Sequence, residues 1–161
     1  MTAPVRVRPA SRRDIQRSAR TFADLPLFTA YGLGSEQLEE RWLSGRGQGD
    51  GLLVALSDDE LVGVCWFLPS GTFATGAYLR TLAVVPAAQS QGIGARLLEE
   101  FERATAGAPG GWFLLASDDN EGAHRFYQRH GYREVGRIPD FAKKGLSERI
   151  FFKANPAPGH R

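Results

Sequence analysis

The chain has 161 residues, of which 42% are hydrophobic and 24% charged, and its formal net charge is +2. This is enough chain for one domain with its own core, and the composition excludes the disordered, collagen-like and membrane classes. Scattered arginines argue against nucleic-acid or membrane partners, and the absence of an apolar signal or spanning segment predicts a cytoplasmic protein.

The N-terminal segment predicts a strand followed by two helices. Residues 5–8 alternate apolar and charged side chains, as in a half-buried strand, and Ser11 is expected to cap a helix that ends near Ala23. Residues 24–34 are rich in aromatic residues and helix breakers, which predicts a connecting segment with a defined conformation between the two helices. Ser35 is then expected to cap a short second helix that ends near Ser44.

Three strands are expected next. A flexible loop at residues 45–51 precedes two apolar runs, 52–56 and 61–68, which a polar turn joins into a hairpin. After a loop around residues 69–76, a third strand is expected at about 77–85. The single cysteine, Cys65, cannot form an internal disulfide, and no His or Asp neighbours it, so we interpret it as a buried packing residue rather than a nucleophile.

The C-terminal half alternates helices with strands. The expected elements are a helix at 92–106, an apolar strand at 112–116, a helix at 120–130 closed by Gly131, and closing strands at about 132–136 and 148–153. This order implies a parallel strand pair within a mainly antiparallel sheet. We predict an α/β (α+β) fold with a mixed central sheet of six to seven strands and about four helices, in one domain over residues 1–155 with a flexible tail at 156–161.

The segment between the third strand and the next helix carries the most chemical information. It reads Leu82-Ala83-Val84-Val85-Pro86-Ala87-Ala88-Gln89-Ser90-Gln91-Gly92-Ile93-Gly94-Ala95-Arg96. The first N–H groups of a helix lack internal partners and lie at its positive end, so a glycine loop there can bind phosphate. Leu97 excludes a dinucleotide-binding G-x-G-x-x-G, and no Walker sequence is present, although G-x-G alone is equally typical of a turn.

In this context the chain resembles the GCN5-related N-acetyltransferase (GNAT) family, whose signature is Q/R-x-x-G-x-G/A after a strand ending in Leu-Ala-Val and Pro. Residues 89–94 match every fixed position. The resemblance implies an acetyl-CoA cosubstrate, whose pyrophosphate the loop amides hold while the main chain of the preceding strand pairs with the pantetheine arm. The residues implied are Leu82, Ala83, Val84, Gln89, Gln91, Gly92, Ile93, Gly94, Ala95 and Arg96.

A second segment strengthens the resemblance. Residues 120–132, Asn-Glu-Gly-Ala-His-Arg-Phe-Tyr-Gln-Arg-His-Gly-Tyr, are similar to the family's N-x-x-A-x-x-F-Y-x-x-x-G-F/Y. By resemblance, Tyr127 is the general acid that protonates the departing coenzyme A thiolate, and Asn120 binds the pantetheine arm. From the residues alone, Tyr127 is better interpreted as an amphipathic core residue. Asn120 is equally well interpreted as a helix N-cap.

The resemblance implies acetyl transfer to a primary amine of a small molecule or amino-acid-like acceptor, by direct attack in a ternary complex. The alternatives are a peptide or protein acceptor, or a non-catalytic acetyl-CoA sensor. No metal is expected, because the three histidines have no ligand spacing. A homodimer stays open, since dimers are common in the family.

The base that deprotonates the amine is not evident from the sequence. Family members often place a glutamate in the central strands, where this chain has apolar residues such as Leu115. The remaining candidates are more typical of caps and surface groups: Asp24, Tyr31, Glu36, Asp118 and Asp119. The acceptor pocket is expected to use Phe22, Leu27, Phe28, Tyr31 and the loop 139–145.

Overall fold

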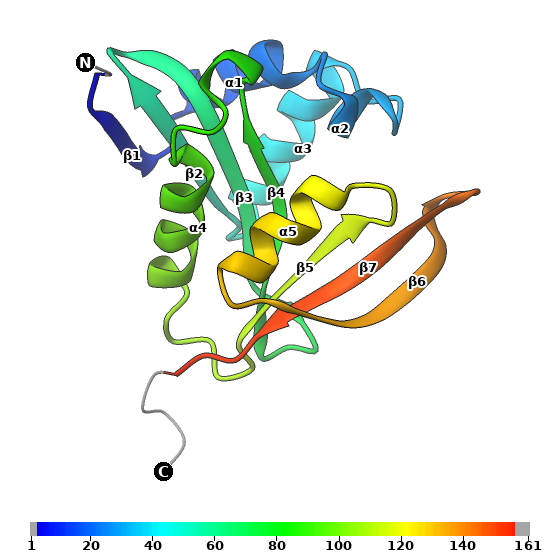
Figure 1. The fold of residues 1–161 in the computed structure, drawn as a ribbon. Helices are drawn as coiled ribbons and strands as arrows, with labels where there is room; N and C mark the ends of the chain where they lie inside the picture. Colours follow the sequence, from blue (N-terminus) through cyan, green and yellow to red (C-terminus); the bar gives the residue numbers. More distant parts are fainter. Residues whose placement is uncertain (1–2, 157–161) are drawn as a thin grey trace. The chain divides into compact units, whose positions relative to one another are not determined.

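The computed structural model describes residues 3–156. Seven strands form a mixed sheet in the order β1-β2-β3-β4-β5-β7-β6 (Figure 1), which confirms the predicted fold class. The strands are β1 (Val5–Pro9), β2 (Gly51–Ser57), β3 (Glu60–Thr72), β4 (Gly76–Val84), β5 (Trp112–Ser117), β6 (Arg133–Lys143) and β7 (Leu146–Lys153). The helices are α1 (Arg12–Phe22), α2 (Pro26–Thr29), α3 (Ser35–Gly47), α4 (Ile93–Ala104) and α5 (Glu121–Arg129), with a 3-10 turn at Pro86–Ala88.

The chain divides into two compact units. The first comprises Met1–Leu68 and Thr81–Ala104, and the second comprises Pro69–Arg80 and Thr105–Arg161. Strands β3 and β4 each contribute residues to both units. The first unit contains the helix that follows the glycine loop, whereas the second contains α5 with the second motif.

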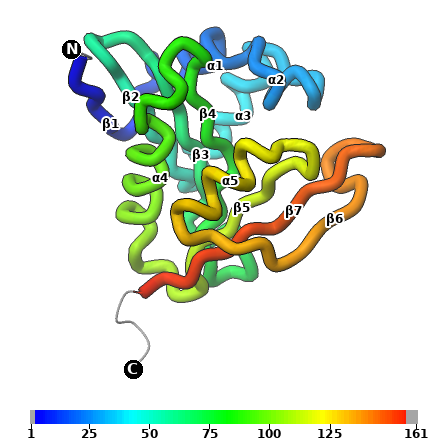
Figure 2. The backbone as a smooth tube through the Cα atoms, in the orientation of Figure 1, coloured from blue at the N-terminus to red at the C-terminus, as the bar shows by residue number. Residues whose placement is uncertain are grey.

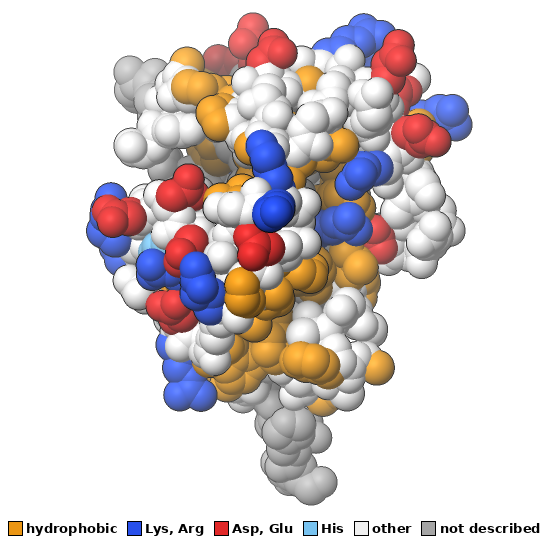
Figure 3. Space-filling model, turned by 90° about the vertical axis from the view of Figure 1, so that its right-hand side faces the viewer, with side chains coloured by type: hydrophobic (Ala, Val, Ile, Leu, Met, Phe, Trp, Pro, Cys, Tyr) orange, Lys and Arg blue, Asp and Glu red, His pale blue; other side chains and the backbone are white. Residues whose placement is uncertain are grey.

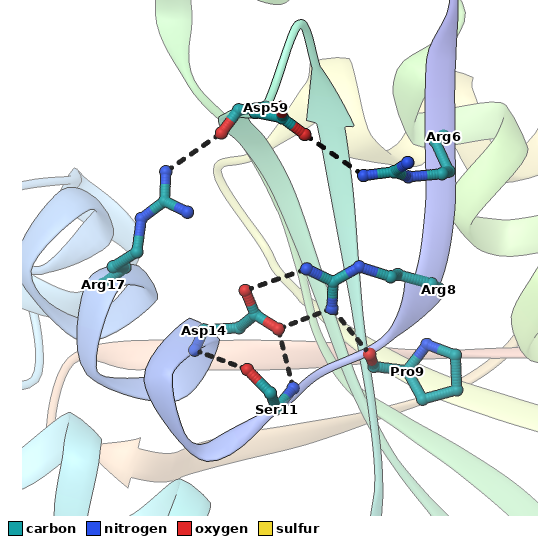
Figure 4. Close-up of polar contacts among 7 residues, drawn as sticks. All are labelled: Arg6, Arg8, Pro9, Ser11, Asp14, Arg17 and Asp59. Atoms are coloured by element: carbon teal, nitrogen blue, oxygen red, sulfur yellow. Dashed lines mark hydrogen bonds and ion pairs between the residues drawn. The ribbon is translucent and has the colours of Figure 1, made fainter.

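The start of α1 follows the prediction from the sequence. The hydroxyl of Ser11 accepts a hydrogen bond from the Asp14 amide at 3.1 Å, and the Asp14 carboxylate accepts one from the Ser11 amide at 2.7 Å. Arg8 donates two further hydrogen bonds to the Asp14 carboxylate (Figure 4). Burial raises the pKa of Asp14, but the hydrogen bonds from Arg8 and Ser11 outweigh it and lower this pKa to about 2.

The core of the first unit lies where α1 and α3 pack together against its strands. Ile15, Ala19 and Phe22 recur at helical spacing on α1, and all three are fully buried. Trp42 of α3 is also fully buried and meets Phe28 edge to face, with ring centroids 6.0 Å apart. The apolar spacing along the helices therefore determines which faces form this core.

The structure corrects the predicted ends of α3. Its N-cap is Gly34 rather than Ser35, and the Gly34 amide donates to Oε1 of Gln37 at 3.1 Å. The helix runs on to Gly47 and β2 begins at Gly51, so the loop expected at 45–51 is confined to residues 48–50. Gly45 is a helical residue at which a Cβ would lie 2.3 Å from Asp50 Oδ2, so glycine is needed there for close packing.

The hairpin of β2 and β3 is confirmed, but its turn is shorter and β3 longer than expected. Asp58 and Asp59 form the two-residue turn, and both have positive φ, as a type I′ turn requires. β3 continues to Thr72 and so takes up the first half of the loop expected at residues 69–76. β2 begins at Gly51 opposite Phe67, so Pro69 lies beyond the part of β3 that pairs with β2.

In the second unit, β4 and β5 form the predicted parallel pair, and β7 pairs antiparallel with both β5 and β6. β6 and β7 form one long hairpin (Figure 2). β6 extends to Lys143, so the loop expected at 139–145 is wrong apart from Lys144 and Gly145. Pro139 is compatible with β6 because this strand lies at the edge of the sheet.

Most of the tail expected at 156–161 cannot be compared with the prediction, because residues 157–161 lie outside the described part of the chain. Among residues 3–156, none of the helices is both long enough and apolar enough to cross a membrane.

Candidate functional site

The first segment singled out by the sequence motifs is the loop that leads from β4 into α4, in the first unit. Ser90 and Gly92 adopt positive φ angles of 64° and 78°, which turn the chain into the helix. The Gly92 carbonyl then accepts a hydrogen bond from the Arg96 amide at 3.1 Å, so the helical hydrogen bonds start there. The amides of the first turn, from Gly92 onward, consequently have no acceptor within the helix and lie at its positive end.

The space around Gly92 is open. A Cβ built on this residue would have no atom within 4 Å, so packing does not demand glycine here. The positive φ does demand it, because an L side chain is strained in this region. The result is an exposed turn at which a ligand can approach the backbone closely.

Side chains around the loop hold its backbone in shape. Gln89 Nε2 donates to the Val84 carbonyl at 3.2 Å, and Gln91 Nε2 lies 3.5 Å from the Ala87 carbonyl. Arg96 of α4 donates to the Val5 carbonyl of β1. The side chains of Gln89 and Gln91 thus contact the backbone of the loop itself.

The apolar face of α4 fixes the start of this helix. Ile93, Leu97, Leu98 and Phe101 are all buried. A Cβ on Gly63 of β3 would lie 2.8 Å from Leu97 Cδ1, so this glycine allows α4 to pack closely on the strand. In β4, Ala83 is buried, whereas Leu82 and Val84 are half-buried.

The second segment singled out by the sequence motifs is α5, in the second unit. Asn120 Oδ1 accepts a hydrogen bond from the Ala123 amide at 3.1 Å, which confirms it as the N-cap. Gly131 has a φ of 87° just after the helix, as expected. Tyr127 is 8% exposed, and its ring centroid lies 6.2 Å from that of Phe151 on β7 and 5.8 Å from that of Tyr132.

His124 is a buried polar residue that the sequence reasoning missed. Its Nε2 lies 2.8 Å from the Ser117 carbonyl, and its ring stacks on Phe151 with centroids 5.6 Å apart. It shares a face of α5 with Tyr127, three residues further on. His124 therefore links α5 to the end of β5. Its spacing of three residues from Tyr127 is the feature of the sequence that could have indicated that it shares the buried face of α5.

A second buried polar group that the sequence reasoning missed is Glu148 on β7. It is 5% exposed, and its Oε1 accepts a hydrogen bond from the Ser117 hydroxyl at 3.3 Å. Ser117 and Glu148 are opposite each other in the β5–β7 register. In the sequence, Glu148 alternates with Ile150 and Phe152 along β7. This alternation predicts that the three side chains share a face of the strand, but it does not predict that Glu148 is buried.

The carboxylates considered in the sequence analysis lie at the surface. Asp118 forms ion pairs with Arg149 at 2.6 Å and Arg137 at 3.2 Å, and hydrogen bonds from these arginines hold its pKa below the usual value. Asp24, Glu36 and Asp119 are exposed.

The residues expected in the acceptor pocket separate into two groups. Phe22 is fully buried and Phe28 is 4% exposed, both in the core of the first unit. Leu27 is 43% exposed and Tyr31 half-buried, so these two reach the surface.

Cys65 has the properties expected of a packing residue. It is fully buried, and burial raises the pKa of its thiol well above the usual value. Within the described part of the chain, no three His, Cys, Asp or Glu side chains come together as a group able to hold a metal ion.

One face of the molecule is shown in Figure 3. Hydrophobic side chains gather on its lower half, and the lysines and arginines are interspersed with acidic groups. The large apolar side chains exposed in the second unit are Phe73, Val135 and Phe141.

The fold is shared with solved acetyltransferase structures. Arabidopsis thaliana NAA60, in complex with a bisubstrate analogue, is 20% identical with a TM-score of 0.73, over 94% of this chain and 98% of that one. Salmonella typhimurium YncA, with its cofactor acetyl-CoA, is 16% identical with a TM-score of 0.77, over 96% of each chain. An aminoglycoside 6'-N-acetyltransferase complexed with coenzyme A is 19% identical with a TM-score of 0.75, over 92% of this chain and 96% of that one.

Comparison with curated proteins gives no match. The family model described as "Acetyltransferase (GNAT) domain" matches residues 48–134, which include both sequence motifs and more than half of the chain. The chain belongs to the GNAT acetyltransferase family.

Proposed function

We propose that the protein transfers an acetyl group from acetyl-CoA to a primary amine of a small-molecule or amino-acid-like acceptor. The transfer occurs by direct attack in a ternary complex, and one catalytic domain over residues 1–155 carries it out. The observation that carries this proposal is the start of α4, where an open turn at Gly92, with a φ of 78°, precedes helix amides that have no acceptor within the helix. The same segment holds the family's signature.

The pyrophosphate of the coenzyme binds to the backbone amides from Gln91 to Arg96. These amides lie at the positive end of the helix dipole, which complements the negative charge of the pyrophosphate. No side chain packs within 4 Å of a Cβ built at Gly92. Gln89 shapes the loop through its contact with the Val84 carbonyl. The main chain of Leu82, Ala83 and Val84 pairs with the pantetheine arm. YncA and the aminoglycoside acetyltransferase, which share this fold, were solved with acetyl-CoA and coenzyme A.

Residues of α5 serve the other end of the coenzyme. Asn120 uses its carboxamide oxygen as the helix cap, so its amide nitrogen is the group that binds the pantetheine arm. Tyr127 is the general acid that donates its phenolic proton to the sulfur as the thiolate leaves. The aromatic contacts of Tyr127 with Phe151 and Tyr132 hold its ring in one orientation. The backbone amide of Val84 polarises the thioester oxygen.

Direct transfer requires no nucleophilic cysteine. Cys65 is fully buried and its thiol pKa is raised, both of which oppose formation of a thiolate that could accept the acetyl group. The acceptor amine therefore attacks the thioester carbon itself.

The test is thiol release from acetyl-CoA across a panel of amines, amino acids and short peptides, with acetyl-CoA binding measured separately by calorimetry. We expect saturable binding and turnover with at least one small primary amine. Turnover with peptides alone would indicate a peptide or protein acceptor in place of a small molecule. Tight binding of acetyl-CoA without any turnover would indicate an acetyl-CoA sensor. Absence of binding would contradict the proposal altogether.

A further inference from the structure

His124 on α5 is a buried imidazole to which the proposed function gives no role. Only 6% of the residue is exposed, and its Nε2 lies 2.8 Å from the Ser117 carbonyl at the end of β5. A carbonyl oxygen can only accept a hydrogen bond, so Nε2 carries the hydrogen and donates it. The same carbonyl also accepts a hydrogen bond from the Asn120 amide at 2.9 Å. Ser117 therefore holds the start of α5 through both a backbone amide and the imidazole.

The ring of Phe151 on β7 links His124 to Tyr127. His124 stacks on Phe151 with ring centroids 5.6 Å apart and an angle of 27° between the planes, and Tyr127 lies against the same ring at 6.2 Å. Residues three apart on a helix are neighbours on one face, so His124 and Tyr127 both face the fully buried Phe151. A change in how His124 lies on Phe151 can therefore reach Tyr127 through a ring that both contact.

The hydrogen bond between His124 and Ser117 restrains the rotation of α5 about its own axis. Hydrogen bonds are directional, whereas apolar packing of rings tolerates small shifts. Side-chain atoms lie about 5–6 Å from a helix axis, so a rotation of about 10° would move the end of the Tyr127 side chain by about 1 Å. Displacement of a catalytic group by that distance can lower a rate about 100-fold. An anchor within one turn of Tyr127 can therefore control whether its hydroxyl is correctly placed.

The stability of the fold does not require a polar side chain at this position. An apolar ring of similar size could pack on Phe151 as the imidazole does. Removal of one hydrogen-bonding partner is costly mainly when the other partner is left buried and unpaired. Without the imidazole, the Ser117 carbonyl would keep its hydrogen bond from the Asn120 amide. The donor of His124 is therefore expected to affect the orientation of α5 more than its stability.

We propose that His124 is a positioning residue for Tyr127. Its Nε2–H group, bound to the Ser117 carbonyl, holds α5 in the rotation that directs the Tyr127 hydroxyl toward the leaving sulfur. This inference rests on the proposed function, in which Tyr127 is the general acid. His124 itself takes no part in the proton transfers and touches neither the coenzyme nor the acceptor. Its effect should consequently appear in kcat and only as long as Tyr127 is present.

The test compares two variants that each keep one property of His124. His124→Phe keeps a ring against Phe151 and removes the donor, whereas His124→Gln removes the ring and keeps an N–H group near the position of Nε2. With saturating acetyl-CoA and the best amine of the panel, His124→Phe should lower kcat about 10-fold, and His124→Gln should recover most of this loss. The Kd for acetyl-CoA should stay within about twofold in both. The melting temperature of His124→Phe should change by less than about 4 °C.

A double variant shows whether His124 acts through Tyr127. Once Tyr127→Phe has removed the hydroxyl, the position of that hydroxyl no longer matters, so the addition of His124→Phe should lower kcat no further. Two independent contributions would instead multiply their losses. If His124→Phe does not fold, His124→Leu takes its place in both backgrounds, since it also lacks a donor and is smaller.

Each other outcome overturns the inference. An unchanged kcat in His124→Phe would remove His124 as a positioning residue while leaving the acetyl transfer intact. Equal losses in His124→Phe and His124→Gln, or a loss that multiplies with that of Tyr127→Phe, would show that no donor acts through the hydroxyl. A loss of kcat accompanied by weaker acetyl-CoA binding and a large fall in melting temperature would show that His124 is structural. Failure of the wild type to acetylate any amine would overturn the proposed function and, with it, this inference.

Discussion

The glycine loop of the first unit and the buried polar residues of the second unit are built in different ways. In the first unit, the loop before α4 offers backbone amides, and its geometry depends on a contiguous segment with a positive φ at Gly92. In the second unit, Tyr78, Ser117 and Glu148 come from three strands and from positions far apart in the sequence. A loop that exposes its backbone amides depends on contiguous residues and is therefore recognisable in the sequence. A cluster of side chains from several strands is hardly recognisable there, because its members are far apart along the chain.

This comparison predicts that bulk or charge placed in the first turn of α4 disables the loop. Gly94→Glu should weaken acetyl-CoA binding about 1,000-fold, because it sets a carboxylate against the pyrophosphate at a cost of several kcal/mol. An acidic residue in the first turn does not oppose helix formation, so the fold should persist. Calorimetric titration with acetyl-CoA measures the effect.

Gly107→Glu is the matched control, since Gly107 is exposed and a Cβ there would have no atom within 4 Å. It should bind acetyl-CoA as the wild type does. Tight binding by Gly94→Glu would contradict the assignment of the loop.

The second unit should instead be sensitive to the loss of a single atom. Tyr127→Phe removes only the phenolic oxygen and should lower kcat about 100-fold through loss of the general acid. The Kd for acetyl-CoA should stay within about twofold, because the ring keeps its contacts with Phe151 and Tyr132. Steady-state kinetics with parallel calorimetry separates the two quantities, and an unchanged kcat would exclude Tyr127 as the acid.

The cap of α1 supports the first unit without taking part in chemistry. Asp14→Ala removes the hydrogen bonds with Ser11 and Arg8 and should lower the free energy of unfolding by about 1–2 kcal/mol. Arg6→Ala removes an exposed ion pair with Asp59 and should change stability by less than about 1 kcal/mol. Urea unfolding compares the two variants, and equal effects would show that the cap contributes no more than a surface pair.

Asp14 also predicts a pH dependence of stability. Its pKa is about 2 in the folded chain and 3.8 ordinarily, so the folded state favours the ionised form. The stabilisation is complete above about pH 5 and is lost progressively as the pH falls through 4 and then through 2. The difference in melting temperature between the wild type and Asp14→Ala should therefore shrink over this range. A constant difference would indicate that the Asp14 pKa is not lowered.

The smallest effect on activity is expected at Cys65. Cys65→Ala should leave kcat unchanged and lower stability by about 1 kcal/mol, since it removes a buried sulfur from the core. Loss of turnover in a folded variant would point to a covalent acetyl-cysteine intermediate in place of direct transfer.

The sequence predicted the elements whose signals are local. Ser11 and Asp14 mark the start of α1, and the apolar spacing of Ile93, Leu97 and Phe101 marks α4. The errors came from glycine and proline residues that usually interrupt helices and strands. Gly45 lies within α3, where Asp50 and Trp66 pack so closely that a Cβ would not fit. The Asp50 carboxylate accepts a hydrogen bond from Trp66 Nε1 at 2.8 Å. This glycine therefore reflects close packing rather than the end of a helix.

The chemistry of the second unit was only partly predictable. Tyr127 was identified through a motif, whereas Glu148 stands among polar and charged neighbours that suggest a surface strand. Its burial becomes apparent only once β5 and β7 are in register and Ser117 lies opposite it. A buried carboxylate whose partners come from other strands cannot be recognised from spacing alone.

The central claim is that the amides at the start of α4 bind the pyrophosphate of the coenzyme. The most direct measurement is a titration of the ¹⁵N-labelled protein with coenzyme A, followed through the amide resonances of Gly92, Ile93, Gly94 and Ala95. We predict large shifts at these amides with coenzyme A and none with pantetheine, which lacks the pyrophosphate. Saturable binding of coenzyme A that leaves all four resonances unmoved would contradict the claim.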